Sequence, residues 1–295
     1  MSRVRLQGLW TIGNAATLAD MPLSAPTDPV RLRERLLGPA TGPDPTSGAG
    51  LWRTVEVVAS TGSTNADASQ RWRAGNGLGL VLVSDHQSAG RGRFDRRWQA
   101  PPGTAVAVSV VVQPRRPILE WMWLSLLTGV AIARGIRRAT GVDATLKWPN
   151  DVLVEGRKIC GILSERVEGQ AGAGCIVGFG INVSLDMDEL PVPTATSLAL
   201  CGVEVDKADL VAEVLADWSQ MYRLWDEGRL EELRAAYEES CSTIGRDVSV
   251  LLDAPGGGRR TVTGVAVGIG PTGEVLVRTP SGVEGFAAGD VTHLR

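Results

Sequence analysis

The chain has 295 residues, 43% of them hydrophobic, and a formal net charge of −3. This length is sufficient for one large domain and a smaller one, and the slightly acidic balance argues against a surface that binds nucleic acid or anionic lipid over its whole extent. The four cysteines, none at zinc-ligand spacing, and only two histidines disfavour a common metal site and predict reduced thiols in a cytoplasmic protein.

Residues 1–50 are predicted to form a poorly ordered leader with one short helix. Polar residues and glycines interrupt its apolar residues, so neither an export signal nor a membrane span is expected. Asp28 is a good cap for a helix that begins at Pro29 and ends at Gly38. A Pro/Gly-rich linker follows as far as Gly50, and Met21 is an alternative start of the chain.

Residues 51–243 alternate between strand and helix patterns, which predicts an α+β domain built on a mixed β-sheet flanked by helices. Strands are predicted at 54–58, 80–83, 104–112, 146–154, 158–165 and 175–183. Helices are predicted from Gly62 to about Gly75 and over 121–139, 206–225 and 229–239.

Residues 244–295 contain short strands separated by glycine turns, the pattern of a small SH3-like β-barrel. The strands are predicted at 247–252, 261–269, 274–279, 282–287 and 291–294. The segment 268–273 matches the dinucleotide-binding glycine pattern, but Pro271 and a following strand leave no helix N-terminus for a pyrophosphate. We therefore regard that match as false.

The segment 86–98 is the most unusual stretch, because it places four arginines and one aspartate between two predicted core strands. Long loops between core strands are uncommon unless they are functional. Gly90 and Gly92 let the backbone approach a ligand closely, and guanidinium groups bind phosphate or carboxylate in a bidentate manner. On this segment alone, an anion-binding loop and a solvated surface loop are equally supported.

Two further polar groups have both a structural and a functional interpretation. Ser63, Thr64 and Asn65 form a helix cap, or they face a pocket and bind a polar ligand. Asn182 is the lone polar residue of a strand with two glycines, where it bonds the backbone or a ligand.

Polar residues in the predicted strands at 146–154 and 158–165 also have both a structural and a functional interpretation. Asn150 and Asp151 follow a proline that interrupts a strand, which is awkward in a plain sheet. Lys158 can approach Asp151 across a hairpin, as a simple salt bridge or as part of a site. Lys147, Lys158 and Lys207 are the only lysines among 30 basic residues, so either chance or a need for a compact ammonium retains them.

Taken together and in order, these stretches resemble the motif set of the biotin–protein ligase family, in the form without an N-terminal DNA-binding domain. The resemblance covers about Leu51 to Arg295. It rests on Ser63-Thr64-Asn65, Gln87 through Gly90-Arg91-Gly92-Arg93 to Trp98, Lys147-Trp148-Pro149-Asn150-Asp151, Gly156-Arg157-Lys158-Ile159-Cys160-Gly161 and Gly180-Ile181-Asn182-Val183.

The resemblance implies a catalytic domain at 51–243, of the class II synthetase and biotin ligase type, and a barrel domain at 244–295. It implies an enzyme that forms biotinyl-5'-AMP from biotin and ATP with Mg²⁺ and then transfers biotin to a lysine. The biotin-binding residues would be Ser63, Thr64, Asn65, Gln87, Arg91, Gly92, Arg93 and Lys158. Lys158 and Arg93 would be catalytic.

By the same resemblance, the residues on the ATP and adenylate side would be Arg96, Trp98, Lys147, Asn150, Asp151 and Asn182. Asp151 is a candidate Mg²⁺ contact, with no metal ligand firmly assigned. The expected partner is the biotin carboxyl carrier domain of a biotin-dependent carboxylase. Neither DNA nor a membrane is expected as a partner, and the expected state is a monomer or weak homodimer.

The sequence departs from the family pattern at Asp95, where the family often has glycine, and at Cys160, which replaces a small alanine. Two alternatives remain: a lipoate–protein ligase-like acyl adenylation enzyme, and a non-catalytic nucleic-acid-binding module. The second requires exposed aromatic residues on the barrel strands, for which Phe286 alone qualifies.

Overall fold

The computed structural model describes residues 25–38, 50–94, 96–253 and 258–294. The alternative start at Met21, most of the leader and the linker that follows Gly38, and the departure at Asp95 lie outside these residues.

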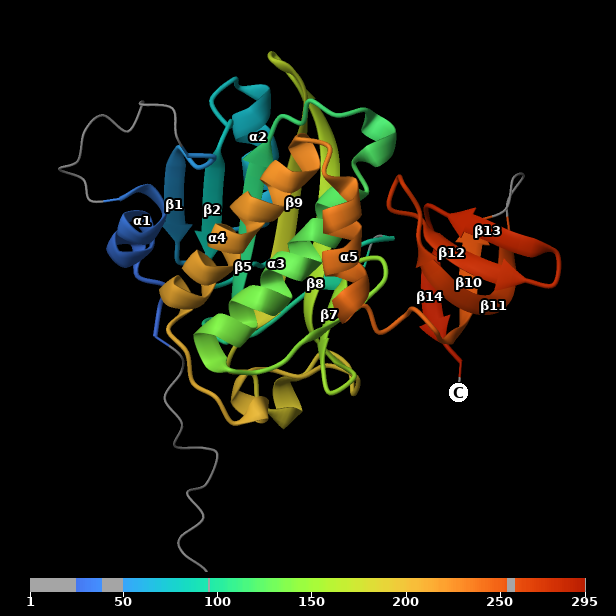
Figure 1. Ribbon diagram of the computed structural model, residues 1–295. Helices are drawn as coiled ribbons and strands as arrows, with labels where there is room; N and C mark the ends of the chain where they lie inside the picture. Colours follow the sequence, from blue (N-terminus) through green and yellow to red (C-terminus); the bar gives the residue numbers. More distant parts are fainter. Residues whose placement is uncertain (1–24, 39–49, 95, 254–257, 295) are drawn as a thin grey trace, which may run out of the picture.

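The large domain is built on a seven-stranded sheet with the order β1-β2-β5-β9-β8-β7-β6 (Figure 1). β1 and β2 are parallel and the other neighbours are antiparallel, so the sheet is mixed, as predicted. The strands are β1 (Thr54–Val58), β2 (Leu80–Ser84), β5 (Ala105–Val112), β6 (Thr145–Lys147), β7 (Asp151–Val154), β8 (Arg157–Gly169) and β9 (Gly172–Asn182).

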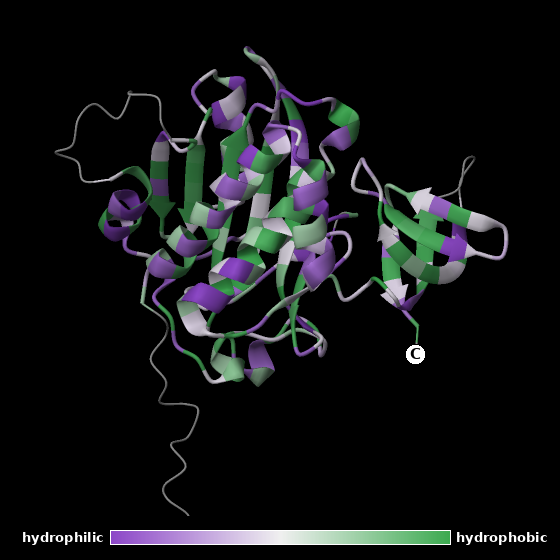
Figure 2. Ribbon diagram, in the orientation of Figure 1, coloured by the Kyte–Doolittle hydropathy of each residue, from purple (hydrophilic) through white to green (hydrophobic). Residues whose placement is uncertain are grey.

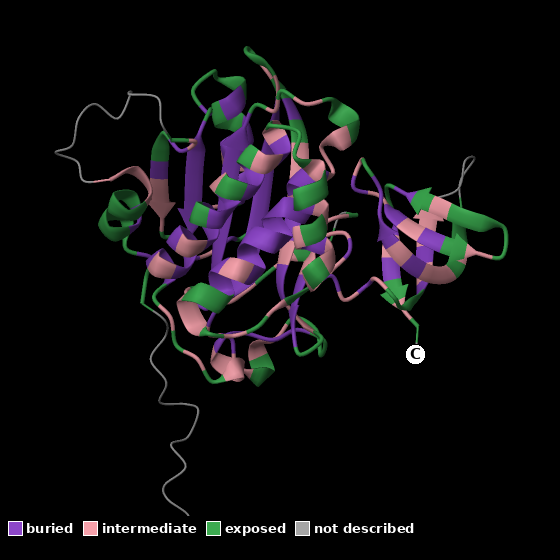
Figure 3. Cartoon of the chain, viewed as in Figure 1, coloured by how far each residue is buried: buried purple, intermediate pink, exposed green. Residues whose placement is uncertain are grey.

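Helices cover both faces of this sheet because its strands carry apolar residues on both sides. In β2, Leu80 and Leu82 pack with Ala68 and Trp72 of α2 (Thr64–Arg73), whereas Val81 and Val83 belong to the larger core. α3 (Trp123–Thr140), α4 (Lys207–Asp226) and α5 (Leu230–Ser240) lie over that opposite face (Figure 1). The central strands β2, β5 and β9 are mostly apolar and almost entirely buried between these layers (Figures 2 and 3).

Within the described residues, 118–140 is the one helical stretch whose length and composition would allow it to cross a membrane. It contains α3 and is mostly buried inside the protein, as expected for a core helix. Short 3-10 helices lie at Ile118–Glu120, Met187–Glu189 and Ala199–Cys201.

The predicted leader helix is present as α1 (Pro29–Leu37). The Asp28 carboxylate accepts hydrogen bonds from the amides of Val30 and Arg31, which satisfies amides that lack partners inside the helix. Leu32 is fully buried, and Arg31 pairs with Asp209 of α4. This end of the leader therefore packs against the large domain, a contact that its sequence did not predict.

The small domain is a five-stranded antiparallel sheet with the order β13-β12-β11-β10-β14. Its strands are β10 (Asp247–Asp253), β11 (Arg259–Ile269), β12 (Val275–Thr279), β13 (Gly282–Phe286) and β14 (Asp290–His293). The number of strands matches the prediction, although the edge strands β13 and β14 are not paired with each other in the part described, so the barrel is not closed there. The segment 268–273 joins β11 to β12, so no helix follows it and the dinucleotide match is indeed false.

Two tryptophans of the large domain hold the small domain in place. The Trp123 indole N–H donates to the Pro271 carbonyl at 2.9 Å, and the Trp148 indole N–H donates to the Gly273 carbonyl at 3.0 Å. Both rings are buried, so each contact combines apolar burial with a satisfied polar group.

Candidate active site

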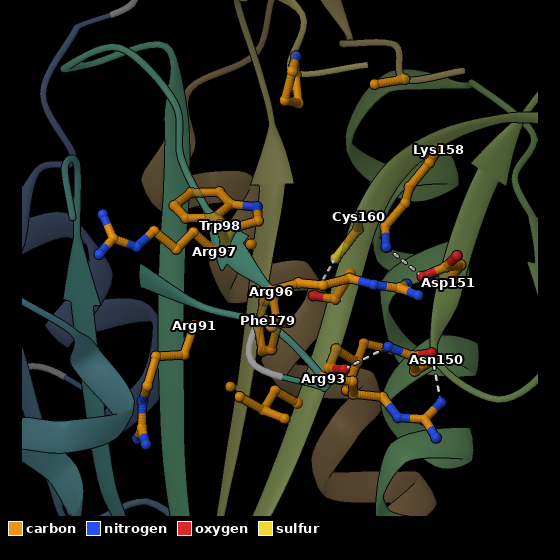
Figure 4. A pocket seen from close by; sticks show the side chains of 18 of the residues that line it. Arg91, Arg93, Arg96, Arg97, Trp98, Asn150, Asp151, Lys158, Cys160 and Phe179 are labelled. Atoms are coloured by element: carbon orange, nitrogen blue, oxygen red, sulfur yellow. Dashed lines mark hydrogen bonds and ion pairs between the residues drawn. The ribbon is translucent and has the colours of Figure 1, made fainter. Parts of the chain in front are cut away.

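A cavity of about 480 Å³ opens on the face of the sheet that carries α2, and residues of the small domain line part of its rim. Every site residue predicted from the sequence lines this cavity, although the predictions come from five separate stretches of the chain. Figure 4 shows its cationic side, with the loop arginines, Lys158 and Asp151.

The start of α2 supplies a group of buried, uncharged polar side chains. Ser63 caps the helix, with its hydroxyl accepting from the Ala66 amide at 3.4 Å. Gln87 Oε1 accepts from the Thr64 amide at 2.6 Å and from the Thr64 hydroxyl at 3.0 Å. The capping and the pocket-facing interpretations of this turn are thus both realised, because the cap also presents its side chains to the cavity.

Two residues that the sequence analysis missed complete this group. The Ser109 hydroxyl on β5 is within hydrogen-bond distance of Thr64 Oγ1 (2.8 Å) and Asn65 Oδ1 (2.6 Å). Glu165 on β8 accepts from Asn65 Nδ2 at 2.7 Å and from Arg91 Nη2 at 2.9 Å. Ser109 had a signal in the sequence, as the single polar residue of an apolar strand.

The arginine-rich loop contains a short hairpin that the sequence did not predict. β3 (Gly90–Arg91) pairs with β4 (Arg97–Trp98), and this places the Trp98 ring over Gly180 of β9. A Cβ atom at Gly180 would lie 2.6 Å from two atoms of that ring, well inside van der Waals contact. Gly180 thus makes room for the hairpin to lie against the sheet, with Gly92 and the arginines around its turn.

Arg93 and Arg96 connect the hairpin to both domains. Arg93 Nη1 donates to Asn150 Oδ1 at 3.1 Å and Arg93 Nη2 to the Gly289 carbonyl at 3.4 Å, while Arg96 pairs with Asp290. Burial is the main effect that lowers the pKa of Arg93 below its ordinary value. Asp290 was not predicted, because it lies 194 residues from Arg96 in the chain.

Lys158 and Asp151 meet across the β7–β8 hairpin, with Lys158 Nζ 2.5 Å from Asp151 Oδ1. The neighbouring Asn150 donates from Nδ2 to the Ile162 carbonyl at 2.9 Å, which orients its oxygen toward Arg93. The turn before them contains a cis peptide bond between Trp148 and Pro149. The interrupted strand predicted at 146–154 is therefore two strands, β6 and β7, joined by a tight turn.

The remaining predicted residues also lie at the cavity wall. Lys147 ends β6, and Asn182 ends β9, where Asn182 Nδ2 donates to the Thr196 carbonyl at 2.9 Å. Asn182 therefore has the backbone partner that its structural interpretation required, and it still lines the cavity.

Cys160 lies in the floor beside Lys158 and is buried, and burial raises the pKa of its thiol far above the ordinary value. A neutral thiol of this kind is a weak nucleophile and acts here as a small apolar group. All four cysteines of the chain are free.

The described ranges hold no cluster of three or more His, Cys, Asp or Glu side chains suited to a metal ion. Mg²⁺ is commonly bound by one or two carboxylates together with substrate phosphates. Two carboxylates lie at the cationic side of the cavity, Asp151 paired with Lys158 and Asp290 paired with Arg96. Such paired carboxylates fit a metal that arrives with a nucleotide better than a resident one.

The arrangement separates two kinds of chemistry along the sheet. Neutral hydrogen-bonding groups gather over β2, β5 and β9, with the Arg91–Glu165 ion pair beside Asn65, and Lys158 and Arg93 lie toward β7 and β8. Such a cavity suits a small acid whose polar head group binds the neutral groups. Its carboxylate would lie at the cationic groups, which can bind a second anion beside it.

The class of protein is given by two family models that match the chain. The Biotin/lipoate A/B protein ligase family matches residues 56–182, and the Biotin protein ligase C terminal domain matches residues 243–294. The two matches correspond to most of the seven-stranded sheet and to the small domain.

Individual relatives narrow this class. The chain is 36% identical over 279 residues to the biotin–[acetyl-CoA-carboxylase] ligase of Mycobacterium tuberculosis, covering 92% of this chain and 98% of that protein. It is 31% identical to the bifunctional ligase/repressor BirA of Bacillus subtilis, covering 72% of this chain and 66% of that protein. The biotin protein ligase from Aquifex aeolicus in complex with biotin and ATP superimposes with a TM-score of 0.71 at 26% identity, covering 83% and 100% of the two chains. The chain belongs to the biotin–protein ligase family.

Proposed function

We propose that this protein is an ATP-dependent ligase that joins biotin to AMP and then transfers biotin to one lysine of a biotin carboxyl carrier domain. The observation that carries the proposal is the convergence of the predicted residues, from five separate stretches, on one cavity with a neutral and a cationic side. The family to which the chain belongs supports the same reaction class.

The neutral side would bind the ring system of biotin. Ser63, Thr64, Asn65 and Gln87 are buried. Thr64 is held by Gln87 and Ser109, Asn65 by Ser109, and Ser63 by the Ala66 amide, so these side chains offer donors and acceptors in fixed positions. A ligand that pairs with buried polar groups recovers the cost of removing them from water. The carboxylate of biotin would then point toward Lys158.

The cationic side would bring two anions together. Lys158, Arg91 and Arg93 would neutralise the biotin carboxylate and the α-phosphate, which otherwise repel each other. A carboxylate oxygen attacks the α-phosphorus, the bond to the β-phosphate oxygen breaks, and pyrophosphate leaves. Arg96, Trp98, Lys147, Asn150, Asp151 and Asn182 would hold the nucleotide.

Mg²⁺ would accompany ATP and neutralise charge on its phosphates as pyrophosphate departs. Asp151 is the residue of this cavity best suited to contact it. Before the nucleotide and its metal bind, the salt bridge to Lys158 orients the Asp151 carboxylate.

The second step would take place under the hairpin. Biotinyl-5'-AMP is a mixed anhydride that water hydrolyses, so a loop that covers it protects it until the acceptor arrives. The amine of the acceptor lysine attacks the acyl carbon and AMP leaves. Such an enzyme would act in the cytoplasm as a monomer or weak homodimer.

The test is to incubate the purified chain with ATP, Mg²⁺, biotin and a carrier domain and to measure the mass of that domain. One added biotinyl group is expected, and none on a carrier whose acceptor lysine is replaced by arginine. Lipoate in place of biotin tests the related ligase activity: labelling by lipoate and not by biotin would reject the proposal.

The nucleic-acid alternative loses its main support. Phe286, the aromatic residue on which it depended, is 6% exposed and packs inside the small domain. A buried ring offers no surface on which a base could stack.

A further inference from the structure

One lysine of the chain lies outside the cavity and is completely buried. Lys207 is the first residue of α4, and its side chain is 0% exposed. Its ammonium group donates to Asp85 Oδ1 at 3.1 Å and to the Gly103 carbonyl at 2.7 Å. Among the ion pairs of the described residues, this is the one in which both side chains are at most 10% exposed.

Asp85 is held from the other side by the segment that leads into α1. Its Oδ2 accepts from the Thr27 amide at 3.0 Å and its Oδ1 from the Thr27 hydroxyl at 2.8 Å. The Asp85 carbonyl also accepts from the Gly103 amide at 3.1 Å. A buried carboxylate with this many donors is well stabilised, so the arrangement defines one geometry.

The two groups that Lys207 joins are the two ends of one functional segment. Asp85 directly follows β2, Gly103 lies just before β5, and the chain between them carries Gln87, the β3–β4 hairpin and the loop arginines. Asp85, at one end of this segment, is buried and Gly103, at the other, is half-buried, whereas the hairpin between them is largely exposed. The position of the hairpin over the cavity therefore depends on how firmly the two ends are held.

We propose that the Lys207–Asp85 pair is a clamp that positions the hairpin over the cavity, and that Thr27 completes it. The inference rests on the proposed function and assigns Lys207 and Asp85 as positioning residues for retention of the adenylate. A lysine suits this place because one compact ammonium reaches both acceptors, whereas a guanidinium would bring five N–H donors into a space with two acceptors.

The first test is the Lys207→Met variant, which keeps the length of the side chain and removes its charge. With ATP, Mg²⁺ and biotin but no acceptor, we expect labelled biotinyl-5'-AMP to leave the variant on the order of tenfold faster than the wild type, because a small displacement of the loop has large effects on a closed site. Hydrogen exchange of the ligand-free protein is expected to be faster at the amides of residues 88–94 and 96–97.

The matched control is Val214→Ala, a core change in the same helix. Val214 packs against Gly135 of α3. It takes no part in the hydrogen bonds that join Lys207, Asp85, Gly103 and Thr27. Compared at equal folded fraction, this variant should release the adenylate at the wild-type rate. Equal release from Lys207→Met and Val214→Ala would overturn the proposal.

A second variant keeps the test decisive if Lys207→Met does not fold. The double variant Asp85→Asn with Lys207→Met leaves no unpaired buried charge and retains an acceptor for Thr27. We expect it to fold while still releasing the adenylate faster than the control; release at the control rate would reject the clamp.

The proposed function and the clamp fail in different ways. If the wild type forms no biotinyl-5'-AMP, the proposed function is wrong. The clamp is then judged by hydrogen exchange alone: faster loop exchange in the double variant than in Val214→Ala supports it, and equal exchange refutes it.

Discussion

At the scale of single residues, the ion pair between Lys158 and Asp151 contributes little to the stability of the fold. Lys158 is 39% exposed, and an ion pair at that exposure contributes about 0–1 kcal/mol to folding. Under the proposed function, Lys158 acts instead through the charge that it presents to the cavity.

We expect Lys158→Ala to reduce adenylate formation by about 10²- to 10³-fold, since it removes a cation from the reacting phosphate. The melting temperature should hardly change. Biotin-dependent exchange of pyrophosphate into ATP measures the first quantity, and near-normal exchange would refute the assigned role.

Gly180→Ala tests the contact that lets Trp98 lie on the sheet. Since the new Cβ atom would come 2.6 Å from the ring, the hairpin must move, and we expect the KM for ATP to rise on the order of tenfold. Gly50→Ala is the control, because its added Cβ would meet only the Trp52 carbonyl, at 3.7 Å. Equal KM values for both variants and the wild type would show that the close approach is unimportant.

At the scale of elements, Arg93 connects the β3–β4 hairpin to both domains, and we propose that this hairpin covers the adenylate. Arg93→Gly removes its bonds to Asn150 and to the Gly289 carbonyl. We expect free biotinyl-5'-AMP to escape and to label bystander proteins, which is measured by the biotin content of added albumin. Arg260→Gly, on exposed β11, serves as control; an unchanged product profile for Arg93→Gly would contradict a shielding role.

The packing of α3 on α4 depends on the absence of a side chain at Gly135. A Cβ atom there would lie 2.6 Å from Val214 Cγ2 and 2.7 Å from Val214 Cα. Overpacking costs about 1–3 kcal/mol and exceeds the gain of about 1 kcal/mol in helix propensity. We expect Gly135→Ala to lower the free energy of unfolding in urea by roughly 1–2 kcal/mol.

Gly129→Ala in the same helix is the natural comparison. Its added Cβ would meet only the ends of the Leu146 and Ile162 side chains, at 3.3 Å or more. These ends can shift, so this variant should change stability much less; a loss equal to that of Gly135→Ala would mean that backbone proximity is not the cause.

At the scale of the whole molecule, hydrogen bonds through Thr243 connect Trp148 of the large domain to His293 of the small domain. The Thr243 hydroxyl accepts from the Trp148 amide at 3.1 Å and lies 3.0 Å from His293 Nε2. Burial, and then repulsion from Lys147 and Arg246, lowers the pKa of His293.

Because the pKa of His293 is lower in the folded protein than in the unfolded chain, the unfolded chain binds a proton at this histidine at a higher pH. Acidification therefore favours unfolding. We expect the free energy of unfolding to decrease from about pH 7.5 to about pH 5.5, around the ordinary histidine pKa of ~6.5. His293→Gln should remove part of this dependence in denaturant titrations. Identical slopes for the variant and the wild type would exclude His293 as a cause.

Most elements could be predicted from the sequence, because they depend on local signals. Apolar periodicity predicted the main helices and the sheet strands, and short motifs predicted groups that lie together in one cavity. The β3–β4 hairpin escaped prediction because each of its strands has two residues, too few for a period to be recognised.

The sequence by itself determined the order of strands and helices, the chemical types of the cavity residues and the resemblance to a ligase family. Only the tertiary structure decided which distant groups support them. Glu165 on Asn65, Asp290 on Arg96 and Lys207 on Asp85 are contacts between residues about 100 or more apart in the chain. Local periodicity carries no information about such pairs, because they form only when packing brings separate elements together.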